Sequence, residues 1–262
     1  MRVELRHELT GRPGAPVLVL GNSLGTTREL WQPQLAAFEE HFLVLRYEHR
    51  GHDGSPAPSG PYTVDDLGGD VLSLLDRLGL AQVCYAGVSI GGMVGMWLAA
   101  HAPDRIDRLA LCCTTARFDS PDPYLERADQ VRREGIGALA EQVVSRWFTP
   151  SFLSRESATV KRFQQTVSAC SNEGYAGCCE ALAAMDLLPA LPSITASTLV
   201  IAGEDDPATP PRYGQAIADA IPGATLQLVP DAAHLANVEQ ADRVTALLVE
   251  HLVGKGDPGN VL

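Results

Sequence analysis

The chain has 262 residues, of which 45% are hydrophobic and 20% are charged, and its formal net charge is −12. This length suits one large α/β domain or one domain that carries an insertion. An acidic surface repels nucleic acids and anionic lipids, so we expect neither as a partner. No apolar run reaches the roughly 18 residues of a membrane span. The first residues, MRVELRHELTGRPG, lack the apolar segment of a secretory signal, so we expect a cytoplasmic protein.

The cysteines do not indicate a metal site. None of the six has C-x-x-C spacing near histidines; they are Cys84, Cys112, Cys113, Cys170, Cys178 and Cys179. In a cytoplasmic chain such cysteines are mostly small buried hydrophobic residues. We therefore expect no metal.

The first part of the chain alternates apolar runs with stretches of helical periodicity. RVELRHEL (2–9) has the alternation of an antiparallel edge strand. Four apolar runs predict further strands: GAPVLVLG, FLVLRYEH, QVCYAG and RIDRLALCC. Between them, VDDLGGDVLSLLDRLGL (64–80) is amphipathic and GGMVGMWLAAHAP (91–103) has helical length. This order predicts an α/β fold with a mostly parallel sheet and helices on both faces.

The pattern changes near Arg117. Residues 118–191 contain amphipathic helical stretches punctuated by prolines, and no clear strand. We interpret them as a helical cap inserted into an α/β core of residues 1–117 and 192–254. In the second part of that core, STLVIAG and ATLQLV predict strands, and a final helix is expected from Val238 to Leu252. Residues 255–262 are expected to form a loose tail.

The stretch YAGVSIGGMVG (85–95) places one serine among four glycines, between a predicted strand and a predicted helix. In that context G-x-S-x-G indicates a nucleophile elbow. A serine hydroxyl is a poor nucleophile at pH 7, so it needs a histidine that a carboxylate orients. Glu204, Asp205 and Asp206 follow one later strand, and His234 follows the next.

The remaining histidines fit this scheme less well. Surface or capping roles are expected for His7, His41, His101 and His251. His49 and His52 lie in a loop that could face the site, but they precede the serine. The order Ser89, Asp206, His234 is the one expected after such an elbow.

An oxyanion in such a site needs two preorganised N–H donors. Ile90 follows the serine at the start of a helix, where a free amide is expected. The loop NSLGTT (22–27) should supply the other donor, with Leu24 as its candidate.

These features resemble the α/β-hydrolase superfamily over almost the whole chain, and within it the 3-oxoadipate enol-lactonases. The resemblance is carried by GNSLGTTRELWQPQ, EHRGHDGSPAPSGPYTVDDL, GVSIGGMVGMWLAAHAPDRIDRLALCCTTA, RWFTPSF, NEGYAGCCEALAAMDL and IAGEDDPATPP. Asn22 and Ser23 replace the His-Gly that is common in the superfamily, which is typical of the lactonases.

The resemblance implies that Ser89 attacks a lactone carbonyl, with His234 as base and Asp206 as its orienting acid. The family's acid lies three residues after a glycine and three before a threonine; Gly203 and Thr209 match that spacing. The implied reaction is hydrolysis of 3-oxoadipate enol-lactone through an acyl-enzyme, with no cofactor. The implied substrate is a small molecule that carries a carboxylate.

The candidate substrate-binding residues are Asn22, Ser23, Arg146, Trp147 and Tyr175, of which Trp147 is implied by the resemblance. The substrate carboxylate would need donors, but the cap cations Arg133, Arg146, Lys161 and Arg162 are expected as solvated surface charges rather than as such donors. Two residues depart from the family pattern, because Glu48 replaces an Asp and Asp53 replaces a Gly. An Asp53 side chain facing the pocket would disfavour an anionic lactone.

The elbow does not separate a lactonase from a carboxylesterase, a C–C bond hydrolase or a perhydrolase. A ligand sensor on a hydrolase fold is an alternative from a different class. The sequence leaves open the oligomeric state and a fusion to a decarboxylase.

Overall fold

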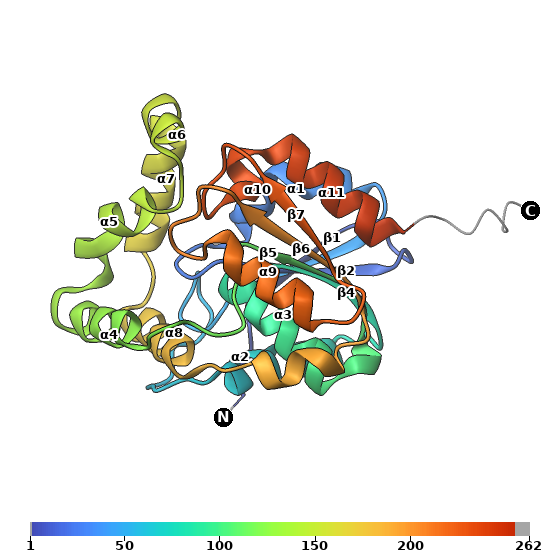
Figure 1. Ribbon diagram of the computed structural model, residues 1–262. Helices are drawn as coiled ribbons and strands as arrows, with labels where there is room; N and C mark the ends of the chain where they lie inside the picture. Colours follow the sequence, from blue (N-terminus) through green and yellow to red (C-terminus); the bar gives the residue numbers. More distant parts are fainter. Residues whose placement is uncertain (1, 255–262) are drawn as a thin grey trace, which may run out of the picture.

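The computed structural model describes residues 2–254 (Figure 1), so the predicted tail, 255–262, lies outside the described residues. Its centre is a 7-stranded sheet with the order β1-β3-β2-β4-β5-β6-β7. The strands are β1 His7–Gly11, β2 Val17–Gly21, β3 Leu43–Tyr47, β4 Val83–Val88, β5 Ile106–Cys112, β6 Ser197–Gly203 and β7 Thr225–Val229. β1 pairs antiparallel with β3, and the other neighbours are parallel. The predicted fold class is confirmed.

The edge strand β1 begins later than the sequence pattern predicted. The alternation of RVELRHEL favoured a strand from Arg2, but the backbone N–H groups of Val3 and Arg6 donate to side chains of other segments. Val3 N donates to Asp70 Oδ1 at 2.9 Å, and Arg6 N donates to Ser55 Oγ at 2.9 Å. The alternation reflects burial of Val3 and Leu5.

Helices cover both faces of the sheet (Figure 1). α1 and α11 pack together on one face, and α2, α3 and α9 lie on the other. The core helices are η1 Arg28–Trp31, α1 Gln32–Glu39, α2 Val64–Arg77, α3 Ile90–His101, η2 Pro103–Arg105, η4 Leu188–Ser193, α9 Pro211–Ala220, α10 Ala236–Glu239 and α11 Ala241–Val253.

The predicted final helix, Val238–Leu252, is wrong as one continuous element. The chain forms α10 and α11 with a break at Gln240, where φ is −120° and ψ is 52°. Side chains at the break bond to the preceding loop: Gln240 Nε2 donates to Asp231 O at 2.8 Å, and the Glu239 carboxylate accepts from Ala233 N at 3.0 Å. The spacing of apolar residues in the sequence does not reveal such a break.

A group of helices lies beside the sheet, at the left of Figure 1. It comprises α4 Asp122–Glu134, η3 Ile136–Leu139, α5 Ala140–Ser145, α6 Pro150–Arg155, α7 Ser157–Ser168 and α8 Asn172–Ala184. The segment leaves and rejoins the core at adjacent points, because Leu187 N donates to Ala116 O at 2.9 Å and Arg117 pairs with Asp186 at 3.2 Å. We propose that residues 118–191 are a cap and that 1–117 with 192–254 form the core.

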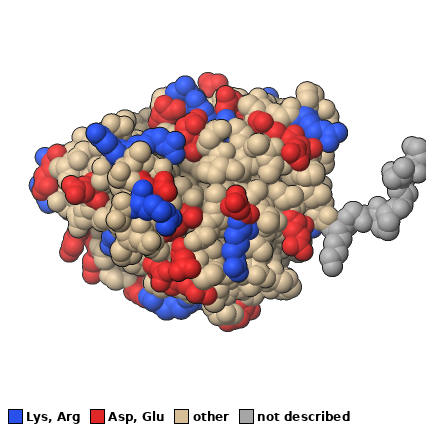
Figure 2. All heavy atoms as spheres, turned by 90° about the horizontal axis from the view of Figure 1, so that it is seen from above, with Lys and Arg blue, Asp and Glu red and all other residues tan. Residues whose placement is uncertain are grey.

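Side chains of both charge signs are interspersed on the face shown in Figure 2. All six cysteines are buried and free. Across residues 2–254, no helix is both long and apolar enough to cross a membrane.

Candidate active site

Ser89 lies in a sharp turn between β4 and α3. Its backbone has φ 55° and ψ −119°, a conformation that costs a non-glycine residue energy and that clusters at functional sites. Ser89 N donates to Cys112 O at 2.9 Å, which ties the turn to the end of the neighbouring strand. The sequence-predicted serine therefore occupies a strained turn at the carboxyl edge of the sheet.

Two of the surrounding glycines are required by close backbone approach. A Cβ on Gly91 would lie 2.4 Å from Gly21 O, and a Cβ on Gly87 would lie 2.3 Å from the Gly91 backbone. Neither residue has positive φ; only Ser89 in this turn does. The glycines thus allow α3 to start directly against β2 and β4.

Asp206 and His234 meet at the ends of β6 and β7. Asp206 Oδ2 accepts a hydrogen bond from His234 Nδ1 at 2.9 Å and another from Thr209 Oγ1 at 2.6 Å. Its other oxygen accepts from the backbone N–H groups of Ala208 at 2.8 Å and Thr209 at 3.0 Å. Because Nδ1 faces Asp206, Nε2 is the ring nitrogen left for proton exchange.

The pKa of Asp206 reflects opposing effects. Burial works to raise it, but the charge and hydrogen bond of His234 and the hydrogen bonds from Thr209 bring the pKa below its ordinary value. Asp206 is therefore ionised at neutral pH and can orient an imidazole and stabilise its protonated form.

Ser89, Asp206 and His234 all follow strands of the parallel part of the sheet, so they lie at the same edge. Within residues 2–254 no hydrogen bond joins the Ser89 hydroxyl to His234. Such bonds are commonly long before substrate binds.

The Ile90 amide, which follows the serine, and the Leu24 amide, in a loop bonded to the start of α3, are free to donate. Within the described residues, neither Leu24 N–H nor Ile90 N–H has an acceptor. Ile90 opens α3, and Leu24 lies in the loop after β2. Gly91 N donates to Asn22 O at 3.1 Å, which links the two segments. Both predicted oxyanion donors are thus buried and available.

Trp147 and Tyr175 of the proposed cap lie over the loop that carries Leu24. An added Cβ on Gly25 would be 3.1 Å from Tyr175 Cε2 and 3.7 Å from Trp147 Cη2. Trp147 O also accepts from Leu235 N at 3.0 Å, next to His234. The structure therefore brings these predicted binding residues to the site.

Asn22 and Arg146 bond to the protein through their side chains, and Ser23 does so through its backbone. Asn22 Nδ2 donates to Tyr47 O at 2.8 Å, and the Ser23 carbonyl accepts from Thr26 Oγ1 at 2.7 Å. Arg146 is exposed, and its Nη2 donates to Pro207 O at 3.1 Å, directly after Asp206. Arg146 borders the site from the cap rather than pointing freely into solution.

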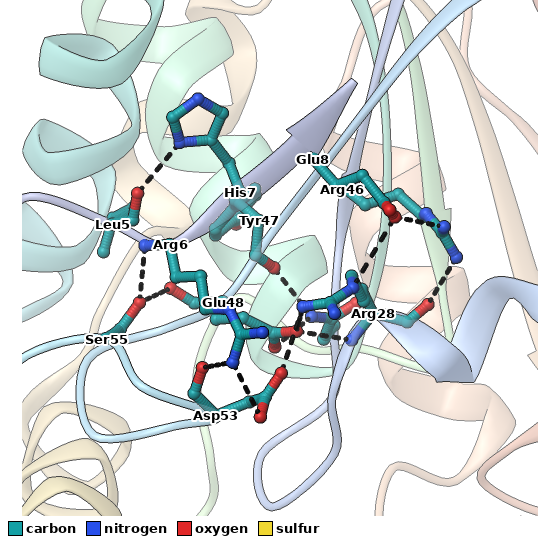
Figure 3. Close-up of polar contacts among 11 residues, drawn as sticks. Leu5, Arg6, His7, Glu8, Arg28, Arg46, Tyr47, Glu48, Asp53 and Ser55 are labelled. Carbon is teal, nitrogen blue, oxygen red and sulfur yellow. Dashed lines mark hydrogen bonds and ion pairs between the residues drawn. The ribbon is translucent and has the colours of Figure 1, made fainter. Parts of the chain in front are cut away.

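The two departures from the family pattern, Glu48 and Asp53, belong to one charged cluster (Figure 3). Asp53 takes φ 35°, so it adopts the left-handed conformation that a glycine would favour. Its carboxylate pairs with Arg6 at 3.1 Å and with Arg28 at 3.0 Å. Two guanidinium groups therefore offset the Asp53 charge.

Sequence reasoning missed Arg127 on α4. It is partly buried, lies over the Tyr124 ring at 5.4 Å and adjoins Tyr175. Arg132 on the same helix pairs with Glu173 and Glu180, whereas Arg127 has no carboxylate partner in the part of the chain described. No sequence signal separates these two arginines, because both lie in a charged helical stretch.

Comparisons with known proteins agree with this geometry. A model of the alpha/beta hydrolase fold family matches residues 16–241. The chain is 40% identical over 238 residues to 3-oxoadipate enol-lactonase 2 of Acinetobacter baylyi, which covers 91% of this chain and 89% of that protein. A protein of Stutzerimonas stutzeri named as the carbamate hydrolase RutD is 32% identical, with 95% and 96% covered.

Among solved structures, the enol-lactonase from Burkholderia xenovorans LB400 is 44% identical with a TM-score of 0.94, covering 96% of this chain and 97% of that one. A thermophilic esterase from Thermogutta terrifontis is 32% identical with a TM-score of 0.88, covering 95% and 92%. The chain belongs to the alpha/beta hydrolase fold family.

Proposed function

We propose that the protein hydrolyses 3-oxoadipate enol-lactone to 3-oxoadipate, with Ser89, His234 and Asp206 as its catalytic residues. The observation that carries the proposal is the Asp206–His234 pair at the sheet edge that also bears the strained Ser89 turn. The likeness to enol-lactonases, at 40% and 44% identity, supports the choice of substrate.

The first half of the reaction acylates the serine. Ser89 Oγ attacks the lactone carbonyl carbon while His234 Nε2 takes the hydroxyl proton. The carbonyl oxygen becomes an oxyanion that the N–H groups of Leu24 and Ile90 stabilise. Collapse breaks the ring C–O bond, and the enolate oxygen leaves. After protonation by His234 it tautomerises to the ketone.

The second half releases the acid. His234 removes a proton from a water molecule, which attacks the acyl carbon, and the serine oxygen leaves with that proton. The product is a dicarboxylate bearing a ketone. Asp206 remains ionised throughout and stabilises the imidazolium that forms twice in each cycle.

We propose that Arg127 binds the carboxylate of the substrate. Arg127 is partly buried and has no acidic partner within residues 2–254, so its guanidinium is well suited to bind an anionic ligand, especially in a chain of net charge −12. Tyr175, which adjoins Arg127, also contacts the loop that carries Leu24. The substrate carboxylate would thus lie on the cap side, with its lactone carbonyl at Ser89.

Other esters, C–C bonds, peracids and carbamates remain alternatives on the same catalytic residues, and a ligand sensor is an alternative without turnover. The test is an ultraviolet assay of enol-lactone loss, with the lactone generated in situ from muconolactone by an isomerase. p-Nitrophenyl acetate and a simple carbamate, assayed by ammonia release, are run in parallel.

Rapid loss of the enol-lactone with weak activity on the other substrates is the expected result. Rapid cleavage of the aryl ester or the carbamate without lactone loss would refute the proposal that the enol-lactone is the substrate. An absence of turnover on all of them would refute the proposed hydrolysis of lactones and esters.

A further inference from the structure

The loop that carries Leu24 is bonded to the segment directly after β3. Asn22 O lies 3.0 Å from His49 Nε2, Gly25 N donates to His52 Nε2 at 3.0 Å, and Arg28 N donates to Glu48 Oε1 at 3.1 Å. These contacts bracket Leu24 on both sides. The Leu24 N–H itself is left without an acceptor within the described residues, so its direction depends on its neighbours.

Glu48 makes the most contacts of this kind. Its side chain is fully buried, and its Oε1 accepts from both Arg28 N and Arg28 Nη1, the latter at 3.2 Å. Its Oε2 accepts from Asn22 Nδ2 at 3.3 Å. One carboxylate therefore bonds to the loop before and after Leu24. The Arg28 side of this arrangement is visible in Figure 3.

We propose that Glu48 and His52 are positioning residues that hold the Leu24 N–H toward the oxyanion formed at Ser89. The inference rests on the proposed function, because it takes Ser89 as nucleophile and Leu24 as oxyanion donor. Neither Glu48 nor His52 touches the reacting atoms. His52 acts through the backbone N–H of Gly25, and Glu48 acts through the backbone N–H of Arg28 and the side chains of Asn22 and Arg28.

His52 is suited to accept the Gly25 amide. Its Nδ1 lies 2.8 Å from Arg50 O, so Nδ1 carries the proton and Nε2 presents a lone pair. Burial lowers the pKa of His52, which keeps the ring neutral and the acceptor free. Protonation at Nε2 would replace the acceptor with a donor and break the contact.

Glu48 holds the loop best when it is ionised, because Asn22 Nδ2, Arg28 N and Arg28 Nη1 all donate to its carboxylate. Burial raises the pKa of Glu48 from its ordinary 4.5 to about 7; the Asp53 charge adds to the rise, while Arg28 and Arg6 oppose it. Tyr47 and the Cys170 thiol also lie within the reach of its charge. The loop is therefore held best above pH 7 and less firmly below it.

The departures from the family pattern form part of this arrangement. Arg28 Nη1 is shared between Glu48 Oε1 at 3.2 Å and Asp53 Oδ2 at 3.0 Å. Asp53 thus fixes the guanidinium that Glu48 uses, while its negative charge makes Glu48 easier to protonate. Glu48 and Asp53 act together rather than as independent substitutions.

The experiment measures kcat, KM and the pH dependence of kcat with p-nitrophenyl acetate for wild type, Glu48→Gln, Glu48→Asp and His52→Phe. Glu8→Gln is the matched control, since Glu8 also pairs with the Arg28 side chain, at 3.6 Å, but is 42% exposed and, within the described residues, its carboxylate accepts from no backbone N–H of loop 22–28. Thermal unfolding shows that each variant is folded.

Glu48→Gln and His52→Phe should lower kcat by about 10- to 100-fold with KM changed less than about twofold, because misplacing a catalytic group affects the transition state. The ratio of wild-type to Glu48→Gln kcat should rise through pH 7. Glu48→Asp should restore part of kcat and keep that pH step, and Glu8→Gln should match wild type.

Wild-type kcat in Glu48→Gln, a raised KM at constant kcat, or an unchanged pH profile would overturn the inference. The aryl ester needs no lactone specificity, so failure of the proposed substrate leaves this test intact. Failure of the proposed mechanism would be seen separately, as aryl ester turnover that survives in Ser89→Ala.

Discussion

Replacing Glu48 with glutamine should change the pH dependence of folding stability. The pKa of Glu48 is about 7 in the folded protein and 4.5 as its ordinary value, so the folded state binds this proton more tightly than the unfolded state. Protonated Glu48 therefore makes its full contribution to the free energy of unfolding below pH 4.5, and this contribution is lost as the pH rises through 7. Each pKa unit corresponds to about 1.4 kcal/mol, so ionising Glu48 costs the folded state about 3 kcal/mol.

The assay is urea unfolding of wild type and Glu48→Gln at pH 5 and pH 8. The difference in unfolding free energy, wild type minus variant, should be lower at pH 8 by about 2 to 3 kcal/mol. Glu8→Gln should change stability by less than about 1 kcal/mol, as exposed ion pairs do. A difference that is the same at both pH values would refute the reasoning, because it would mean that Glu48 ionises as it does in the unfolded chain.

Substitutions at Thr209, Gly91 and Arg127 test other parts of the site. Thr209→Val removes a 2.6 Å hydrogen bond to the ionised Asp206 and should lower the steady-state kcat about tenfold. A variant with the kcat of the wild type would contradict this prediction. Gly91→Ala places a Cβ 2.4 Å from Gly21 O and should lower the free energy of unfolding, measured in urea, by about 1 to 3 kcal/mol. A decrease of less than about 0.5 kcal/mol would contradict this prediction. Arg127→Gln should raise KM for the anionic lactone at least about tenfold but leave KM for p-nitrophenyl acetate unchanged; equal changes on both substrates would exclude a carboxylate-binding role.

Local patterns in the sequence were enough to predict the sheet and the residues that follow its strands. β4 is buried at every position, so it appears as an uninterrupted apolar run, and the glycines around Ser89 mark the close approach of α3. Because parallel strands end at a common edge, the predicted acid and base also had to lie there. The Asp206–His234 contact in the structure fits that expectation.

Contacts that depend on tertiary folding were not predictable in the same way. The break at Gln240 is accompanied by bonds from Gln240 to Asp231 and from Ala233 to Glu239, and the position of Arg127 depends on how α4 packs against α8. The bonds from Glu48 and His52 to the loop at Leu24 join residues that are 20 to 27 positions apart. Such pairings can be identified only once the fold is known, because the sequence around one partner does not indicate which residue it will bond to.

The most direct test of the central claim is the rate of enol-lactone loss for wild type and Ser89→Ala at matched concentration. The variant should fall by at least about 10³-fold while its thermal unfolding stays that of a folded protein, because the side chain serves the reaction rather than the core. Turnover of the lactone by Ser89→Ala near the wild-type rate would contradict nucleophilic catalysis at the β4–α3 turn.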